Sequence, residues 1–131
     1  MKLEPFDWKK LHPKARDHFF GLNAWLHDQW MAGLTPTRFR PFEGYRSPAR
    51  QRYLLDVAKT TRADSFQSAH NYGLAVDFVP FVDDKWSWDP SHDWKHLHFG
   101  ARQRGLMVPL ASWDKAHIEH PIWHAIKSQL T

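Results

Sequence analysis

The sequence of residues 68–77 is Ser-Ala-His-Asn-Tyr-Gly-Leu-Ala-Val-Asp, which places a glycine between a histidine and an aspartate. The segment Leu74–Val79 alternates in residue type, with the larger apolar side chains on one face and Asp77 on the other, and it predicts a strand. Gly73 permits a tight backbone path before this strand, so a loop histidine and a strand aspartate can converge on one ion. Because imidazole and carboxylate are both zinc ligands, we expect His70 and Asp77 to bind a metal.

A second polar group follows at residues 113–119, whose sequence is Trp-Asp-Lys-Ala-His-Ile-Glu. We expect His117 to be the third ligand, because three protein ligands leave the fourth tetrahedral position of a catalytic zinc to water. Zinc can lower the pKa of such a water to roughly 7. Asp114 precedes His117 by three positions, where it would accept the proton as a general base and pass it to a leaving amine.

The region before this motif predicts a strand, a turn and a helix. The segment Thr35–Phe42 carries two prolines among β-favouring residues, so we expect an edge strand that leads into the turn at residues 43–45. Residues 47 and 48, Ser-Pro, supply an N-cap and a first-turn proline for a helix that ends near Lys59. Arg46 therefore lies immediately before a helix start.

The remaining elements are predicted from apolar periodicity and from capping residues. They are a helix at Asp7–Ala32 that Pro13 kinks or splits, a surface loop at Asp83–Pro90, a helix capped by Ser91 that runs to about Arg104, short strands at Met107–Leu110 and Ala116–Glu119, and a final helix with Pro121 at its first position that ends near Leu130. Helices and strands mix without regular βαβ alternation, which indicates the α+β class.

The composition limits the kind of protein and the chemistry of its site. The chain of 131 residues fits one compact domain, residues 1–131, and 42% of it is hydrophobic. It has no cysteine, so any metal must be held by histidine and carboxylate. We expect no signal peptide, because charges are spread through Met1–Lys10 without an apolar segment. We expect no membrane insertion, because no apolar segment approaches the length that a membrane span requires. The net charge of +4 favours polyanionic surroundings or simply keeps the surface soluble, and no nucleic-acid recognition motif is present.

Three motifs resemble those of the M15-type zinc metallopeptidases. This family contains L-alanyl-D-glutamate endopeptidases of phage endolysins, D-Ala-D-Ala dipeptidases and D,D-carboxypeptidases. The matching pieces, in the family's order, are Gly44-Tyr45-Arg46-Ser47, the Ser-x-His-x-x-Gly-x-Ala-x-Asp run from Ser68 to Asp77, and the pair Asp114 and His117.

The resemblance implies a small antiparallel sheet flanked by helices, of the Hedgehog/D,D-peptidase-like type, with one Zn2+ ion in a cleft on the sheet. It also implies that His70, Asp77 and His117 bind the metal and that Asp114 is the catalytic base. Arg46 would stabilise the substrate carbonyl or the tetrahedral intermediate, and Ser68 would hydrogen-bond the loop or contact the substrate. An aspartate at position 114 resembles the L-alanyl-D-glutamate branch, so the expected substrate is that bond of the peptidoglycan stem.

The sequence is also compatible with other functions and with a second site. A D,D-carboxypeptidase or dipeptidase of the same fold, or a catalytically silent zinc-binding structural domain, would carry the same metal ligands. We expect a monomeric phage or prophage lysin, present in the host cytoplasm before release or associated with the virion, and acting on the cell wall. His96 and His98 are interpreted as surface or packing residues. His120 and His124, together with Glu119, would form a second metal site or assist the first, or His120 would cap the final helix.

Overall fold

The computed structural model describes residues 5–59, 61, 63 and 67–130 of the chain. Its elements, in chain order, are η1 (Trp8–Lys10), α1 (Pro13–Met31), β1 (Phe39–Glu43), α2 (Pro48–Asp56), η2 (Ala69–Tyr72), β2 (Ala75–Val82), β3 (Lys85–Trp86), α3 (Trp94–Gln103), β4 (His117–Glu119) and α4 (Ile122–Lys127), where η denotes a 3-10 helix. This order confirms the predicted α+β class. No helix within the described part of the chain is long and apolar enough to cross a membrane.

The strand β2 organises a four-stranded antiparallel sheet, because every other strand pairs with it. Strand β1 pairs with β2 from Phe39 opposite Pro80 to Glu43 opposite Asp77, with an irregularity in register before Glu43. Strand β4 pairs with the first residues of β2 and places His117 opposite Asp77. Directly paired residues project from the same face of a sheet, so Glu43, Asp77 and His117 form a row across three strands.

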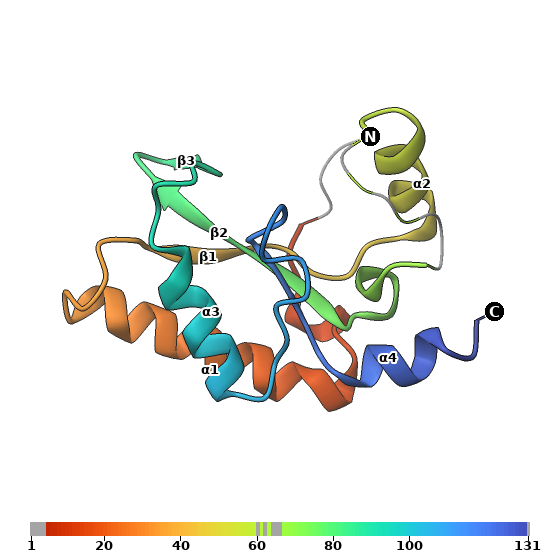
Figure 1. The fold of residues 1–131 in the computed structure, drawn as a ribbon, viewed down its shortest axis with the longest axis horizontal. Helices are drawn as coiled ribbons and strands as arrows, with labels where there is room; N and C mark the ends of the chain where they lie inside the picture. Colours follow the sequence, from red (N-terminus) through yellow and green to blue (C-terminus); the bar gives the residue numbers. More distant parts are fainter. Residues whose placement is uncertain (1–4, 60, 62, 64–66, 131) are drawn as a thin grey trace.

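Two helices lie along the sheet and two lie near the start of β2 (Figure 1). Figure 1 shows α1 running along the sheet with α3 beside it, whereas α2 and α4 lie toward the end where β2 begins. The core between α1, α3 and the sheet is apolar and partly aromatic, and its largest fully buried apolar side chains are Leu11, Phe19, Leu22, Leu26, Leu74, Val76, Phe78, Val79, Leu97 and Ile118. This packing holds β2 and β4 rigidly beneath the site.

Pro13 splits the first predicted helix rather than kinking it. Residues Trp8–Lys10 form the separate turn η1, and α1 starts at Pro13, which lacks an N–H at a position where none is needed. The imidazole of His12 caps this start, because its Nδ1 accepts a hydrogen bond of 3.1 Å from the N–H of Lys14.

The third predicted helix begins later than expected. The backbone N–H of Ser91 bonds the carboxylate of Asp89 at 2.8 Å, so Ser91 belongs to a preceding turn and does not cap the helix. Helix α3 starts at Trp94 with Asp93 at the N-cap. The carboxylate of Asp93 accepts a hydrogen bond of 2.8 Å from the hydroxyl of Thr35, which anchors the helix start to the loop before β1.

The strand predicted at Met107–Leu110 is wrong except for its first residue. Met107 and Glu119 exchange two backbone hydrogen bonds of 2.8 and 3.0 Å, which form an isolated bridge. The carbonyl of Leu110 accepts from the N–H groups of Trp113 and Asp114, so the chain turns here instead of extending. Pro109, which has no N–H to donate, also disfavours a ladder.

Part of the predicted loop at Asp83–Pro90 is a strand. Residues Lys85–Trp86 form β3 and close a hairpin with the end of β2. Asp83 and Asp84 both have positive φ angles, 51° and 62°, as the two central residues of a type I′ hairpin turn require. The final helix also differs at its ends, since Pro121 is its N-cap and α4 stops at Lys127.

Candidate metal centre and cleft

His70 is held in place by a local hydrogen-bond motif at the start of η2. The hydroxyl of Ser68 accepts from the N–H of His70 at 3.2 Å, while the side chain of Asn71 accepts from the N–H of Ser68 at 3.1 Å. This reciprocal pair is a capping box, which satisfies two otherwise unpaired donors. The Ser68 hydroxyl therefore supports the loop, as one of the two expectations for this residue stated.

Gly73 ends η2 and turns the chain into β2. Its φ angle is 69°, in the left-handed region that favours glycine. A Cβ at this position would lie 2.6 Å from the backbone nitrogen of His12 and 2.7 Å from the carbonyl oxygen of Lys10. The glycine is thus required both by the backbone conformation and by the close approach of the segment before α1.

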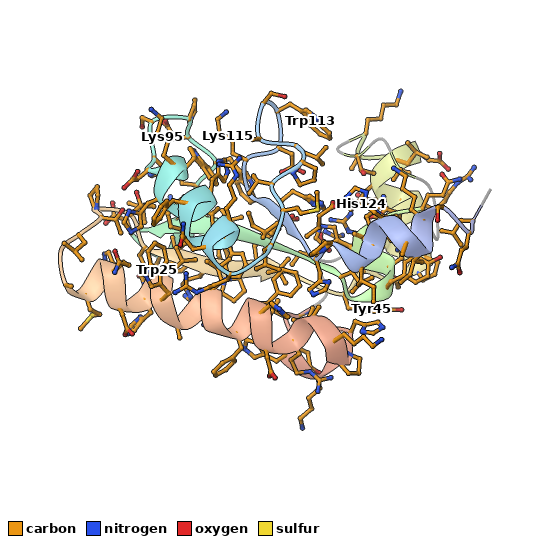
Figure 2. All side chains as sticks on the ribbon, turned by 60° about the horizontal axis from the view of Figure 1, so that its bottom comes forward. Trp25, Tyr45, Lys95, Trp113, Lys115 and His124 are labelled. Carbon is orange, nitrogen blue, oxygen red and sulfur yellow. The ribbon has the colours of Figure 1, made fainter. Side chains whose placement is uncertain are left out.

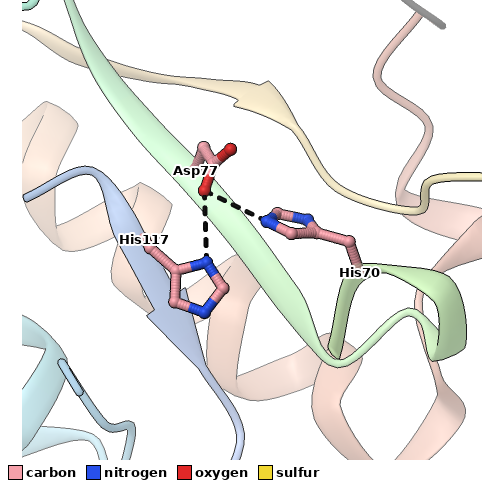
Figure 3. Close-up of side chains that lie close together, drawn as sticks. All are labelled: His70, Asp77 and His117. Carbon is pink, nitrogen blue, oxygen red and sulfur yellow. Dashed lines mark hydrogen bonds and ion pairs between the residues drawn. The ribbon is translucent and has the colours of Figure 1, made fainter. Parts of the chain in front are cut away.

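Three side chains from η2, β2 and β4 converge on one point (Figure 3). His70 Nε2 lies 3.2 Å from Asp77 Oδ1, and His117 Nδ1 lies 3.5 Å from the same oxygen. One ligand atom from each residue lies within 4.8 Å of the other two, as a shared ion requires. His70, Asp77 and His117 can therefore hold a metal ion.

The second ring nitrogen of each histidine supports this interpretation. His70 Nδ1 lies 2.7 Å from the carbonyl oxygen of Gly44, and His117 Nε2 lies 2.8 Å from Glu119 Oε1. Because a carbonyl and a carboxylate only accept, both nitrogens carry the proton. When a metal is bound the two imidazoles are neutral, and these outer partners keep the proton on His70 Nδ1 and His117 Nε2, so His70 Nε2 and His117 Nδ1 are the atoms left to coordinate the ion. The donor set fits a zinc ion.

The charges at the centre shift the pKa values of its groups. Burial alone would raise the pKa of Asp77, but the nearby His70 and hydrogen bonds from His117 and His70 hold it well below its usual value. Burial alone would lower the pKa of His117, yet its hydrogen bonds with Asp77 and Glu119 raise it to about 9. The centre thus stabilises positive charge beside the carboxylate of Asp77, which favours a cation.

Arg46 lies next to the centre and is almost fully buried. Its Nη2 is 3.7 Å from Asp77 Oδ2 and 2.6 Å from Glu43 Oε1, and its Nη1 donates to Gln51 Oε1 at 2.8 Å. Glu43 also accepts from Arg50 Nε at 2.6 Å. One buried carboxylate thus positions two guanidinium groups on the same side of the cleft.

Asp114 lies in the turn before β4, at the edge of the cleft. Burial raises the pKa of Asp114, and the negative charge of Asp77 raises it further. The carbonyl of Asp114 accepts from the N–H of His117 at 3.3 Å, which couples the position of the turn to that of the ligand. A carboxyl group with a raised pKa is better suited to accept and return a proton near neutral pH.

These residues line one cleft of about 900 Å³. The cleft extends between α2 and α4 and contains all of the predicted site residues, which are Arg46, Ser68, His70, Asp77, Asp114 and His117. Its volume lies in the range of small-molecule and peptide sites.

Comparisons with solved structures give the fold. The L-Ala D-Glu endopeptidase ChiX of Serratia marcescens matches with a TM-score of 0.58 and 22% sequence identity, over 90% of this chain and 86% of that chain. The LD-carboxypeptidase LdcB, whose structure concerns peptidoglycan recognition, matches with a TM-score of 0.60 and 18% identity, over 97% of this chain and 68% of that chain. This chain shares the fold of these two peptidases. No protein-family model and no curated protein sequence matches it.

Within this peptidase fold, two carboxylates of the site were not predicted from the sequence. Glu43 supports Arg46, and Glu119 supports His117. The sequence places Glu119 with His120 and His124, in a second metal site or in support of the first, whereas its position two residues after His117 on a strand puts it on the same face as that ligand. Glu43 could have been found from the β1–β2 register, which pairs it with Asp77.

The remaining histidines lie outside the centre. His120 Nδ1 accepts from the N–H of Ile122, the first residue of α4, at 3.1 Å, so its side chain satisfies a donor at the helix start as predicted, although Pro121 holds the N-cap position. His124 Nε2 lies 3.4 Å from Glu119 Oε2, and the second metal site stays a prediction. His96 stacks on Trp25 at 4.9 Å and His98 bonds the carbonyl of Lys115 at 2.8 Å, so both are packing residues as expected.

Proposed function

We propose that this protein is a zinc-dependent peptidase that hydrolyses the peptide stem of bacterial peptidoglycan, at the bond between L-Ala and D-Glu. The observation that carries the proposal is the convergence of His70, Asp77 and His117 within 4.8 Å in a cleft that also holds Asp114 and Arg46. The shared fold supports the substrate class, since both structural neighbours are named as peptidases and one as an L-Ala D-Glu endopeptidase.

A zinc ion bound here would supply Lewis acidity, which lowers the pKa of water and polarises a carbonyl group. The proton then needs an acceptor close to the reacting atoms. Asp114 lines the cleft beside the three ligands, and its raised pKa lets it take a proton and return it to the amine that leaves. Asp114 is therefore the general base in this proposal.

Arg46 is the group that stabilises negative charge on the substrate. Its guanidinium is fixed by Glu43 and Gln51, so its donors are already oriented before substrate binds. Oriented donors in a site poor in water stabilise an oxyanion without further reorganisation. Because the planar guanidinium presents several N–H groups at once, a lysine at this position would not replace it.

The test is product analysis of purified peptidoglycan incubated with zinc-loaded protein. We expect glycan strands that keep L-Ala, together with peptides that carry a free D-Glu amino terminus, identified by mass spectrometry. A chelated sample and a His70→Ala variant should release neither product. Stoichiometric zinc binding without any product would contradict the proposal and favour a structural metal domain.

A carboxypeptidase is the second candidate, and one cationic side chain of the cleft favours it. Lys127 of α4 lines the cleft, and its ammonium group suits the free carboxylate at the end of a stem peptide. Release of a single terminal D-amino acid in the same experiment would assign this activity instead.

The origin as a phage or prophage lysin and the monomeric state stay predictions, which rest on the sequence resemblance.

A further inference from the structure

A second, smaller cavity adjoins the cleft on the side of Asp114. It has a volume of about 290 Å³ and is lined by Trp88, Pro90, Trp94, Trp113, Asp114 and Lys115. Trp88, Trp113 and Asp114 line the large cleft as well, so the two spaces adjoin at these three residues. The volume lies just below the range of ordinary small-molecule sites, which suits one ring rather than an extended chain.

Two tryptophans at this junction expose much of their rings to solvent. Trp88 is 53% exposed and Trp113 is 45% exposed, although both lie beside a buried aromatic cluster. The ring of Phe42 packs edge-to-face against Trp88 with centroids 5.0 Å apart, which fixes the orientation of Trp88. Trp94 forms a buried wall, and its indole N–H is already bonded to the carbonyl of Asp89 at 3.0 Å. Trp94 therefore offers the pocket aromatic surface rather than an indole donor.

Polar groups of opposite charge complete the pocket. Asp114 provides an acceptor and Lys115 a donor, and Figure 2 shows Lys115 and Trp113 on the same loop before β4. A ligand that fits this lining needs a C–H face for the tryptophans and hydroxyl or amide groups around its edge. The negative face of an aromatic ring attracts such C–H groups. A phosphate group would meet the carboxylate of Asp114, and a lipid chain would leave both charges without partners.

We infer that this pocket binds a pyranose ring of the peptidoglycan glycan strand, namely the muramyl sugar that carries the stem peptide. The inference rests on the proposed function and deepens it. L-Ala is attached to the lactyl group of this sugar, so cleavage after L-Ala leaves the sugar close to the scissile bond. Asp114 borders both spaces, and a substrate whose scissile bond lies at Asp114 reaches the tryptophans with its sugar. The enzyme then prefers stems that are still attached to glycan.

The experiment compares two substrates with the same stem, one free and one attached to its N-acetylglucosaminyl–N-acetylmuramyl disaccharide. We expect kcat/KM of the parent protein to be higher for the attached stem. The Trp88→Ala and Trp113→Ala variants should each reduce this preference by about fivefold to tenfold, equivalent to roughly 1–1.4 kcal/mol. Phe99→Ala is the control, because Phe99 is 56% exposed on α3 and contacts Trp25 away from the cleft. If the two tryptophans formed an aromatic lid over the cleft instead, the variants would hydrolyse both substrates more slowly by the same factor. That result would overturn the inference.

A titration without metal separates this inference from the proposed function. The disaccharide without peptide should quench the tryptophan fluorescence of the chelated parent protein, and both tryptophan variants should bind it more weakly. If no stem is hydrolysed but the disaccharide binds in this way, the peptidase proposal fails and the sugar pocket stands. If stems are hydrolysed but the disaccharide does not bind and the variants keep the parent preference, the sugar pocket fails and the peptidase stands.

Discussion

At the scale of single residues, Asp114 separates catalysis from metal binding. It lines the cleft but lies outside the group of three ligand residues, and its pKa is raised by burial and by Asp77. We expect Asp114→Asn to lower kcat by about 10²–10⁴-fold, as the loss of a general base does, while zinc affinity stays close to that of the parent protein. Stem-peptide kinetics together with a chelator competition assay measure both quantities. Unchanged turnover would remove Asp114 from the mechanism.

Glu119 acts through His117 and is a positioning residue. Its carboxylate accepts from His117 Nε2 at 2.8 Å, which keeps Nδ1 directed at Asp77. We expect Glu119→Ala to weaken zinc affinity by about 10–100-fold, because partners of this kind orient a ligand and increase its basicity. Glu119→Gln keeps an acceptor and should lose less. Asp28→Asn, an exposed change on α1, should leave affinity unchanged, and equal affinities in all four proteins would contradict the role.

The difference between predicted and missed residues is physical. His70 and Asp77 lie in one short segment, and their spacing around Gly73 is visible in the sequence. Glu43 enters the site through strand pairing, because β1 brings it opposite Asp77. Register between distant strands depends on the whole sheet, so Glu43 could not be assigned from local spacing. Glu119 follows His117 by two residues on the predicted strand, so its place on the same face was visible in the sequence.

At the scale of elements, the turn from η2 into β2 depends on Gly73. We expect Gly73→Ala to destabilise the protein by more than about 2 kcal/mol, because it combines a left-handed backbone with a backbone clash at 2.6 Å. Gly21→Ala is the matched control. Gly21 lies within α1 with no neighbouring atom within 4 Å of a Cβ, so alanine should stabilise the helix by about 0.5–1 kcal/mol. Urea unfolding measures both changes, and similar values for the two variants would refute the argument.

Helix α3 makes stability depend on pH through His98. Burial lowers the pKa of His98, and the charges of Arg102 and Lys115 act in the same direction. The folded state therefore binds a proton less readily than the unfolded state, so His98 contributes stability above its ordinary pKa of about 6.5 and this contribution is lost as the pH falls below it. We expect His98→Gln, which can still donate to the Lys115 carbonyl, to lose less stability than the parent between pH 7.5 and 5.5. Urea unfolding at both pH values is the measurement, and an equal loss would exclude His98 as the cause.

Helices and strands were predicted correctly where the local sequence patterns agree with one another. They were predicted incorrectly where tertiary contacts determine the backbone conformation. The periodicity of α1 and the alternation of β2 are long enough to identify both elements. The apolar run at Met107–Leu110 has the composition of a strand, but a turn through the Leu110 carbonyl prevents pairing beyond Met107. The Asp83-Asp84 turn that creates β3 also lacks the glycine that usually marks such hairpins.

At the scale of the whole molecule, the sheet aligns the residues of the site, and the helices form the walls of the cleft and cover the core. The pairing of β2 with β1 and β4 places the polar residues Glu43, Asp77 and His117 in one row. Helices α2 and α4 then form the walls of the cleft above that row, while the apolar core lies against α1 and α3. His70 and His117 lie far apart in sequence, so the ligands from η2, β2 and β4 come together only in the folded chain.

A centre assembled in this way couples metal binding to folding. The unfolded chain does not hold His70, Asp77 and His117 within 4.8 Å, so an ion that binds them stabilises only the folded state. At free zinc one hundred times its Kd, we expect about 2.7 kcal/mol of added stability, which appears as a higher Tm in calorimetry. His70→Ala should lose most of this zinc-dependent rise, and a chelator should return the parent protein to its metal-free Tm. The Gly21→Ala control should gain the same increment as the parent, because its change lies in α1, away from the three ligands. A Tm that does not respond to zinc in the parent protein would show that the three side chains do not form a metal site.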